Sequence, residues 1–194
     1  MQVIDRGTGT PELVVIGSIH GDEPAGRDAI RRILDSNHTY QKPVRFIVAN
    51  EEALEADERF LEADLNRSFP GNSDSEKHEE RLAARLLEAI GDARVLDIHT
   101  THSHPKPFGT AKDTDTGTME MARASGVDHL VIFPEGSGAL TEFVDGLLVE
   151  TGLQGTDQAV QNAVEVIERV LGFYGIIEHD VDPGDPEIYR YYET

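Results

Sequence analysis

The sequence predicts an α/β fold in three layers, α/β/α, around a central, mostly parallel mixed sheet. Short apolar, β-branched segments alternate with longer segments whose apolar residues recur at helical spacing. Segments that alternate in this way pack as a sheet covered by helices on both faces. The chain has 194 residues, of which 38% are hydrophobic, and this is enough for one domain with a substantial core.

The predicted strands are short and rich in Val, Ile and Leu, as expected for strands buried on both faces. The predicted helices carry one apolar face. Pro24 suits a first helical turn, Thr156 is a candidate N-cap, and Ser73 or Ser75 is a candidate N-cap for the helix that follows them. The strands are Leu13–Ile19, Val44–Ala49, Arg94–His99, His129–Phe133 and Gly146–Glu150, and the helices are Pro24–Leu34, Ser75–Ile90, Thr116–Ser125 and Thr156–Leu171.

Two further segments are less regular. Glu51–Pro70 shows no clear period and ends in the turn signal Phe69-Pro70-Gly71. Near the end of the chain, Pro183–Pro186 interrupts the pattern, and Glu187–Glu193 alternates like the first strand of a further unit.

Charge and composition exclude several classes of function. The chain has 37 acidic and 17 basic side chains, a formal net charge of −20, which opposes binding to nucleic acids and to anionic membrane surfaces. No apolar run approaches the roughly 18 residues of a membrane span, and the N-terminus lacks the pattern of a signal peptide. Because there is no cysteine, disulfides, thiolate metal sites and cysteine nucleophiles are excluded.

The kind of charge indicates where such a protein works. Only four basic residues are lysines, and the acidic residues are spread along the whole chain. This distribution is typical of a cytoplasmic protein from a halophile, whose self-repulsion is screened by salt. An ordinary acidic protein is the alternative.

Polar residues follow three of the predicted strands, where functional sites of α/β sheets lie. His20 and Glu23 follow the first, His99 ends the third, and Glu150 ends the last. Two histidines and one glutamate with an open fourth position are typical of a catalytic zinc site. Spacing alone favours the simpler interpretation, a histidine at a strand end and a glutamate near a helix N-terminus. The third residue, His99, makes the metal-site interpretation equally favoured.

Other polar residues near these clusters leave alternatives open. His102 and His104 are rival ligands, but their loop position before Pro105 favours exposure. Asp97 shares a strand face with His99 and either orients that ligand or serves as a buried structural acid. Arg67, beside Asn66, is suited to hold a carboxylate, whereas surface ion pairing is the ordinary alternative.

Four motifs occur together in this order: Gly17–Glu23 (GSIHGDE), Asp64–Arg67 (DLNR), Asp97–His99 (DIH) and Val149–Gly152 (VETG). This combination resembles the succinylglutamate desuccinylase/aspartoacylase family, which is related to the zinc carboxypeptidases. The motifs span most of the chain and are far more specific jointly than singly.

The resemblance implies a zinc-carboxypeptidase-like fold with one Zn²⁺ per chain. It also implies hydrolysis of the amide bond of a small N-acyl amino acid, the expected partner, by a zinc-dependent amidohydrolase. A zinc carboxypeptidase that cleaves peptides and a non-catalytic relative are the alternatives, and the oligomeric state, monomer or homo-oligomer, stays open. The implied residue roles are zinc ligation by His20, Glu23 and His99, general-base catalysis by Glu150, carbonyl polarisation by Arg59, and substrate binding by Asn66 and Arg67.

The resemblance also bears on domain organisation. The family carries a C-terminal β-rich domain that narrows the mouth of the active site. We therefore expect residues 1–182 to form the zinc-hydrolase catalytic domain. Residues 183–194 are expected to be the start of a C-terminal β domain that is missing or truncated here.

Overall fold

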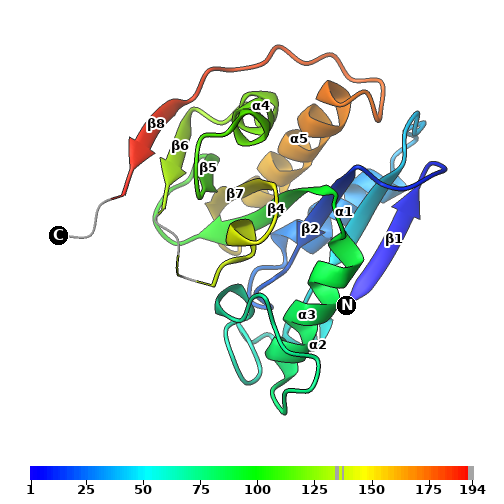
Figure 1. Ribbon diagram of the computed structural model, residues 1–194. Helices are drawn as coiled ribbons and strands as arrows, with labels where there is room; N and C mark the ends of the chain where they lie inside the picture. The colour runs from blue at the N-terminus through cyan, green and yellow to red at the C-terminus, as the bar shows by residue number, and fades with distance from the viewer. Residues whose placement is uncertain (134–135, 137, 192–194) are drawn as a thin grey trace.

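The computed structural model describes residues 1–133, 136 and 138–191. In this part of the chain, one eight-stranded sheet is covered by helices (Figure 1). The strands are β1 (Gln2–Arg6), β2 (Leu13–Gly17), β3 (Val44–Val48), β4 (Arg94–Thr101), β5 (Phe108–Ala111), β6 (His129–Ile132), β7 (Gly146–Leu153) and β8 (Glu187–Arg190). The helices are α1 (Ala25–Asp35), α2 (Glu51–Ala56), α3 (His78–Ile90), α4 (Thr116–Ser125) and α5 (Asp157–Phe173), with 3-10 turns η1 (Leu65–Arg67) and η2 (Leu140–Glu142).

The sheet is mixed and mostly parallel, as predicted. Its strand order is β1-β3-β2-β4-β7-β5-β6-β8. The central strands β3, β2, β4 and β7 run parallel, while β1 is antiparallel to β3 and β5 is antiparallel to β7. The carboxyl ends of β2, β4 and β7 therefore lie along one edge of the sheet, where the predicted functional residues are.

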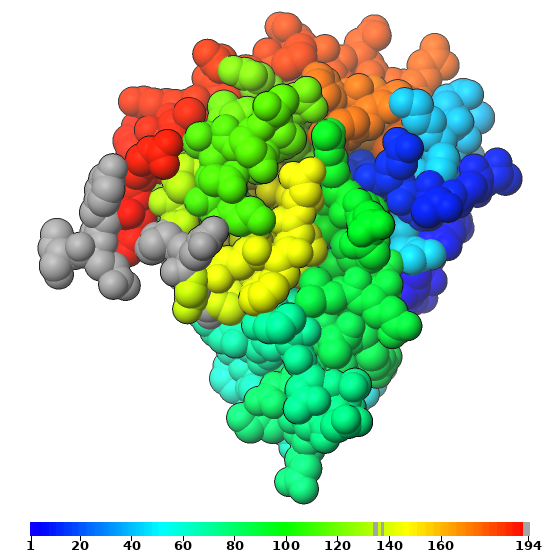
Figure 2. Space-filling model, in the orientation of Figure 1, coloured from blue at the N-terminus to red at the C-terminus, as the bar shows by residue number. Residues whose placement is uncertain are grey.

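Side chains of successive residues enter two separate cores. Val15 of β2 packs in the core that α1, α4 and α5 cover. Its neighbours Val14 and Ile16 pack on the opposite face against α3 and η1. This alternation is the two-residue period of a strand buried on both faces, and it confirms the three-layer prediction. The segment leading into α3 forms the tip at the lower end of the molecule (Figure 2).

The predicted helix start is right for α5 and wrong for α3, whereas the predicted end is right for α3 and two residues too early for α5. Thr156 caps α5, because its Oγ1 accepts a hydrogen bond from the Ala159 amide at 3.2 Å. Helix α3 begins at His78, three residues later than predicted, without a side-chain cap. The hydroxyl of Ser75 instead donates to the Glu80 carboxylate and accepts from the Lys77 amide, which closes a turn before the helix.

Besides the two 3-10 turns, three short elements do not appear among the predicted ones. They are β1, β5 and α2, the last of which has six residues and lies inside the segment predicted to be irregular. No helix in the described residues combines the length and the apolar character needed to cross a membrane.

Strand β8 pairs in parallel with β6 and lies at the edge of the same sheet. It covers only part of the alternating segment Glu187–Glu193, whose last two residues lie outside the described ones. The assignment of residues 183–194 to a C-terminal β domain stays a prediction.

Candidate metal centre

The turn between β2 and α1 carries the first two candidate ligands. Ser18 adopts a left-handed conformation, with φ of 57°, and its hydroxyl donates to the Glu23 carbonyl at 3.0 Å. A Cβ on Gly21 would lie 2.3 Å from the carbonyl carbon of Ala53 in α2, so only glycine fits this close approach. The tight turn leaves the side chains of His20 and Glu23 facing each other, three residues apart.

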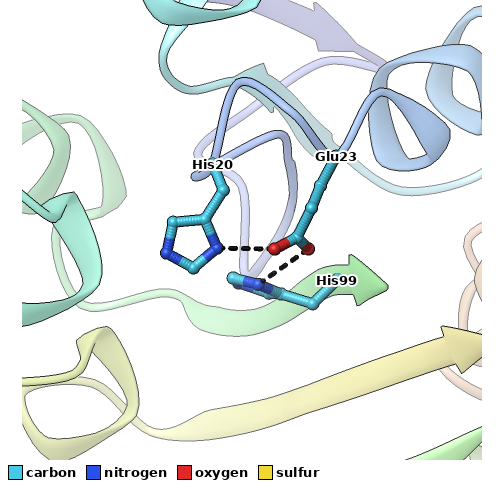
Figure 3. A group of neighbouring side chains, drawn as sticks. All are labelled: His20, Glu23 and His99. Carbon is cyan, nitrogen blue, oxygen red and sulfur yellow. Dashed lines mark hydrogen bonds and ion pairs between the residues drawn. The ribbon is translucent and has the colours of Figure 1, made fainter. Parts of the chain in front are cut away.

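His99, two residues before the carboxyl end of β4, completes a buried group with these two residues. Nδ1 of His20 lies 2.8 Å from Oε1 of Glu23, and Nδ1 of His99 lies 3.4 Å from Oε2 (Figure 3). One ligand atom from each residue lies within 4.8 Å of the others. The structure thus brings together the three predicted ligands, whereas His102 and His104 do not belong to this group.

A carboxylate holds the far side of each imidazole ring. Nε2 of His20 lies 3.1 Å from Oδ1 of Asp64, and Nε2 of His99 lies 3.0 Å from Oδ2 of Asp97. Contacts of this kind fix the tautomer of a metal-binding histidine and leave Nδ1 facing the cation. Asp97 is fully buried and also contacts His99. It therefore fits both interpretations offered by the sequence, a buried structural acid and a residue that orients His99.

Sequence reasoning did not assign a role to Asp64. Asp64 belongs to the Asp-Leu-Asn-Arg motif, but its partner His20 lies 44 residues earlier in the chain, so the sequence does not indicate this contact. Burial alone would raise the pKa of Asp64, but the hydrogen bond to His20 and the charge of Arg59 lower it to about 2. Asp64 is therefore a carboxylate at neutral pH and can accept from His20.

The electrostatics of the group favour a bound cation. Burial alone would raise the pKa of Glu23, but hydrogen bonds from His20 and His99 hold it well below its usual range. Burial alone would lower the pKa of His99, but Asp97 and Glu23 raise it well above its usual value. The two carboxylates that stabilise a proton on His99 equally stabilise a metal cation, which competes with protons for the same atoms.

Arg59 reaches the same group from the loop after α2. Its Nη1 donates to Oε1 of Glu23 at 3.2 Å, and its Nη2 lies 3.1 Å from Nε2 of His20. Its Nε lies 3.6 Å from Oδ2 of Asp64. The side chain is 43% exposed, so the guanidinium borders the buried ligands and faces solvent as well.

Glu150 lies beside the ligands on the neighbouring strand. It pairs in register with His99 across β4 and β7, so both side chains point to the same face of the sheet. Its Oε2 is buried without a hydrogen-bond partner in the described structure. Burial is the main cause that raises the pKa of Glu150 to about 7, with a smaller contribution from Glu23.

Asn66 and Arg67 lie on η1, directly after Asp64. Asn66 is buried, and its Oδ1 accepts from the Leu140 amide at 3.0 Å, which links η1 to η2. Arg67 is exposed, and its Nη1 donates to the Asn66 carbonyl at 2.7 Å. These contacts, the side-chain hydrogen bonds described for the pair, do not involve the three candidate ligands.

Comparison with known proteins agrees with this geometry. The family model for the succinylglutamate desuccinylase/aspartoacylase catalytic domain matches residues 9–165. A succinylglutamate desuccinylase from Idiomarina loihiensis is 32% identical over 157 residues, which are 68% of this chain and 46% of that protein. A protein from Xenopus tropicalis named N-acyl-aromatic-L-amino acid amidohydrolase (carboxylate-forming) is 29% identical over 107 residues, 48% of this chain and 34% of that protein. The chain spans about half the length of the first of these relatives.

Solved structures share the fold. A succinylglutamate desuccinylase/aspartoacylase from Rhodobacter sphaeroides superimposes with a TM-score of 0.81 at 23% identity, over 99% of this chain and 66% of that one. The ectoine utilization protein EutE (DoeB) from Ruegeria pomeroyi gives a TM-score of 0.79 at 21% identity, over 98% of this chain and 66% of that one. The family model covers well over half of the sequence and includes every candidate site residue. The chain therefore belongs to the succinylglutamate desuccinylase/aspartoacylase catalytic-domain family.

Proposed function

We propose that this protein is a zinc-dependent hydrolase that cleaves the amide bond of a small N-acyl amino acid. One observation carries the proposal: two buried histidine Nδ1 atoms converge on the carboxylate of Glu23 beside the buried, partnerless oxygen of Glu150. Membership of the family supports the same reaction class. The relatives named above are desuccinylases and an N-acyl amino acid amidohydrolase.

The donor set suits Zn²⁺. His20, Glu23 and His99 supply two nitrogens and one carboxylate, the His₂Glu set of catalytic zinc sites, and leave a fourth position for water or substrate. When bound, Zn²⁺ supplies Lewis acidity, which polarises a carbonyl and lowers the pKa of water. Asp64 and Asp97 would orient the two histidines toward it.

The chain's own residues supply the rest of the proposed reaction. Glu150, with its pKa near 7, takes a proton from the attacking water and passes it to the leaving amine. Arg59 stabilises the negative charge that develops on the carbonyl oxygen. Arg67 holds the substrate carboxylate, because its exposed guanidinium suits bidentate pairing, and Asn66 supports η1 and the substrate beside it.

The first test measures metal content. We expect the parent protein to bind one Zn²⁺ per chain and His20→Ala or His99→Ala to lose it, as measured by elemental analysis after gel filtration. His102→Ala, a histidine that lies outside the ligand group, is the matched control and should keep its zinc. Full zinc content in either ligand variant would contradict the assignment.

The second test separates the proposed substrate class from its nearest alternative. The zinc-loaded protein is incubated with a panel of N-acyl amino acids and with C-terminal dipeptides, and released amines are quantified. Release from N-acyl amino acids alone supports the proposal. Release from peptides alone supports a zinc carboxypeptidase, and a zinc-loaded protein that hydrolyses neither supports a non-catalytic relative.

A further inference from the structure

One buried acid, Glu79, accepts hydrogen bonds from three consecutive backbone amides of the loop between α2 and η1. Oε1 of Glu79 accepts from the Leu61 amide at 2.7 Å and from Nδ2 of Asn50 at 3.3 Å. Its Oε2 accepts from the amides of Glu62 at 3.1 Å and Ala63 at 3.0 Å. Glu79 is 0% exposed, although Leu61 at the loop surface is 41% exposed.

This arrangement differs from an ordinary core contact. A buried carboxylate is unfavourable unless its oxygens are hydrogen-bonded, and here the donors described are four N–H groups without a formal charge. Burial alone would raise the pKa of Glu79, but the backbone amides lower it, so the side chain is ionised. The carboxylate of Glu62 in turn accepts from the amide of His78, which closes the contact between the loop and the start of α3.

The loop that Glu79 holds is bounded by two residues of the metal centre. Arg59 precedes the bonded segment, residues 61–63, by two residues, and Asp64 follows it directly. Both contact His20, Arg59 through Nη2 at 3.1 Å and Asp64 through Oδ1 at 3.1 Å. The carbonyl of Arg59 also accepts from the amide of Gly21, the residue after His20, at 3.0 Å. Any displacement of the segment therefore moves two side chains and one carbonyl that hold the His20 turn.

We propose that Glu79 is a positioning residue that anchors residues 61–63 to α3 and thereby sets Arg59 and Asp64 against His20. The inference rests on the proposed metal-dependent function. It extends that function, because Glu79 lies outside the ligand group and acts on His20 only through the loop. A helix is a rigid support for this anchor, whereas the loop has no regular secondary structure of its own between α2 and η1.

The test is a double-mutant cycle read as zinc affinity. Glu79→Gln replaces one acceptor oxygen by an NH₂ group that faces N–H donors, so part of the anchor is lost. Removal of a residue that orients a metal ligand weakens metal binding by about 10- to 100-fold. We expect Glu79→Gln and Asp64→Asn each to fall in this range, and the double variant to stay within about threefold of Asp64→Asn alone because the two residues act as one unit.

Two controls separate positioning from general stability. Glu88→Gln makes the same change at an exposed position of the same helix and should leave the zinc affinity unchanged. Zinc affinity is measured by competition with a chromogenic chelator, and the melting temperature is measured beside it. If Glu79→Gln yields no folded protein, Glu79→Asp, which keeps the charge on a shorter side chain, takes its place in the cycle.

The outcomes are distinct. A lower melting temperature with unchanged zinc affinity would show that Glu79 only stabilises the fold, and additive losses in the double variant would show that it does not act through Asp64. Either result overturns the inference. A parent that binds zinc but hydrolyses no N-acyl amino acid contradicts the proposed function and leaves the zinc cycle readable, so the two failures are distinguishable.

Discussion

Two glutamates at the same site have opposite environments, and this difference suits them to different proposed roles. Glu23 accepts from His20 and from the Thr100 amide. Although burial alone would raise its pKa, hydrogen bonds from His20 and His99 keep that pKa well below its usual range, so Glu23 is a carboxylate at neutral pH. Glu150 is buried with one oxygen unpartnered, and its pKa rises to about 7. Carboxylates whose pKa values are driven apart in one site commonly divide binding from proton transfer. Glu23 is accordingly suited to hold a metal and Glu150 to move a proton.

Glu150→Gln should abolish most turnover and leave binding intact. Gln is nearly isosteric and cannot accept the proton, so we expect kcat to fall at least ~100-fold with zinc content and KM little changed. Arg67→Ala is the contrasting variant: it removes the proposed charged contact to the substrate and should raise KM with a smaller effect on kcat. Steady-state kinetics on a hydrolysed substrate measure both. A Glu150→Gln protein that keeps most of its kcat would show that Glu150 is not the base.

Glu150 should lower the stability of the metal-free protein as pH rises. The pKa of Glu150 is raised from 4.5 to about 7 by folding, so between these values the unfolded chain loses a proton that the folded chain retains. Below the pKa of the unfolded chain, Glu150 does not affect the free energy of unfolding. Between the unfolded-state and folded-state pKa values this free energy falls as pH rises, and above the folded-state pKa it is lower by roughly 3 kcal/mol. Glu150→Gln should therefore be more stable than the parent at about pH 8.5 and closer to it at about pH 5. Urea unfolding of both proteins after zinc removal measures the difference, and a gap that does not depend on pH would contradict it.

At the scale of the element, α5 packs against β7, the strand that carries Glu150. Ala163 and Ile167 of α5 lie in the same core as Val149 of β7. The helix starts where Thr156 caps the Ala159 amide, and only a short turn separates this start from the end of β7 at Leu153. The start of α5 and the end of the strand that carries Glu150 are thus neighbours in sequence and in space.

Thr156→Ala should lower stability without altering the metal centre. Loss of an N-cap hydroxyl destabilises a helix start by about 1 kcal/mol, because one backbone N–H loses its partner. Thr156→Ser keeps the hydroxyl and should keep most of the stability. Chemical denaturation measures the free energy of unfolding, and zinc affinity should be the same in all three proteins. A change in zinc affinity would show that the cap also positions β7.

At the scale of the whole molecule, the net charge of −20 governs the response to salt. The acidic side chains repel one another in the compact state, and this repulsion is screened as ionic strength rises. We expect the melting temperature to rise between low and molar KCl, as for a protein adapted to high salt. Differential scanning calorimetry across KCl concentrations checks this expectation. A melting temperature that is flat or falls would remove the halophile interpretation.

Much of the fold followed from the sequence because local pattern decides it. Buried strands and amphipathic helices have short periods that a single segment displays, and α4 occupies the residues that the pattern predicts. The candidate ligands were also visible, because His20, Glu23 and His99 each lie at the end of an apolar strand or directly after one. Elements without a strong period, such as β1 and α2, were missed because tertiary contacts rather than local pattern stabilise them.

Only the tertiary structure decided how the site is held. The sequence by itself determined the fold class, the family and the three candidate ligands. The contacts of Asp64 with His20 and of Glu79 with residues 61–63 join segments 44 and 16 to 18 residues apart. An acidic residue in a loop or a first helical turn looks the same in sequence whether it is solvated or buried. Its role depends on which donors the fold brings within hydrogen-bond distance. Those donors come from distant segments and are brought near only by the packing of the helices against the sheet.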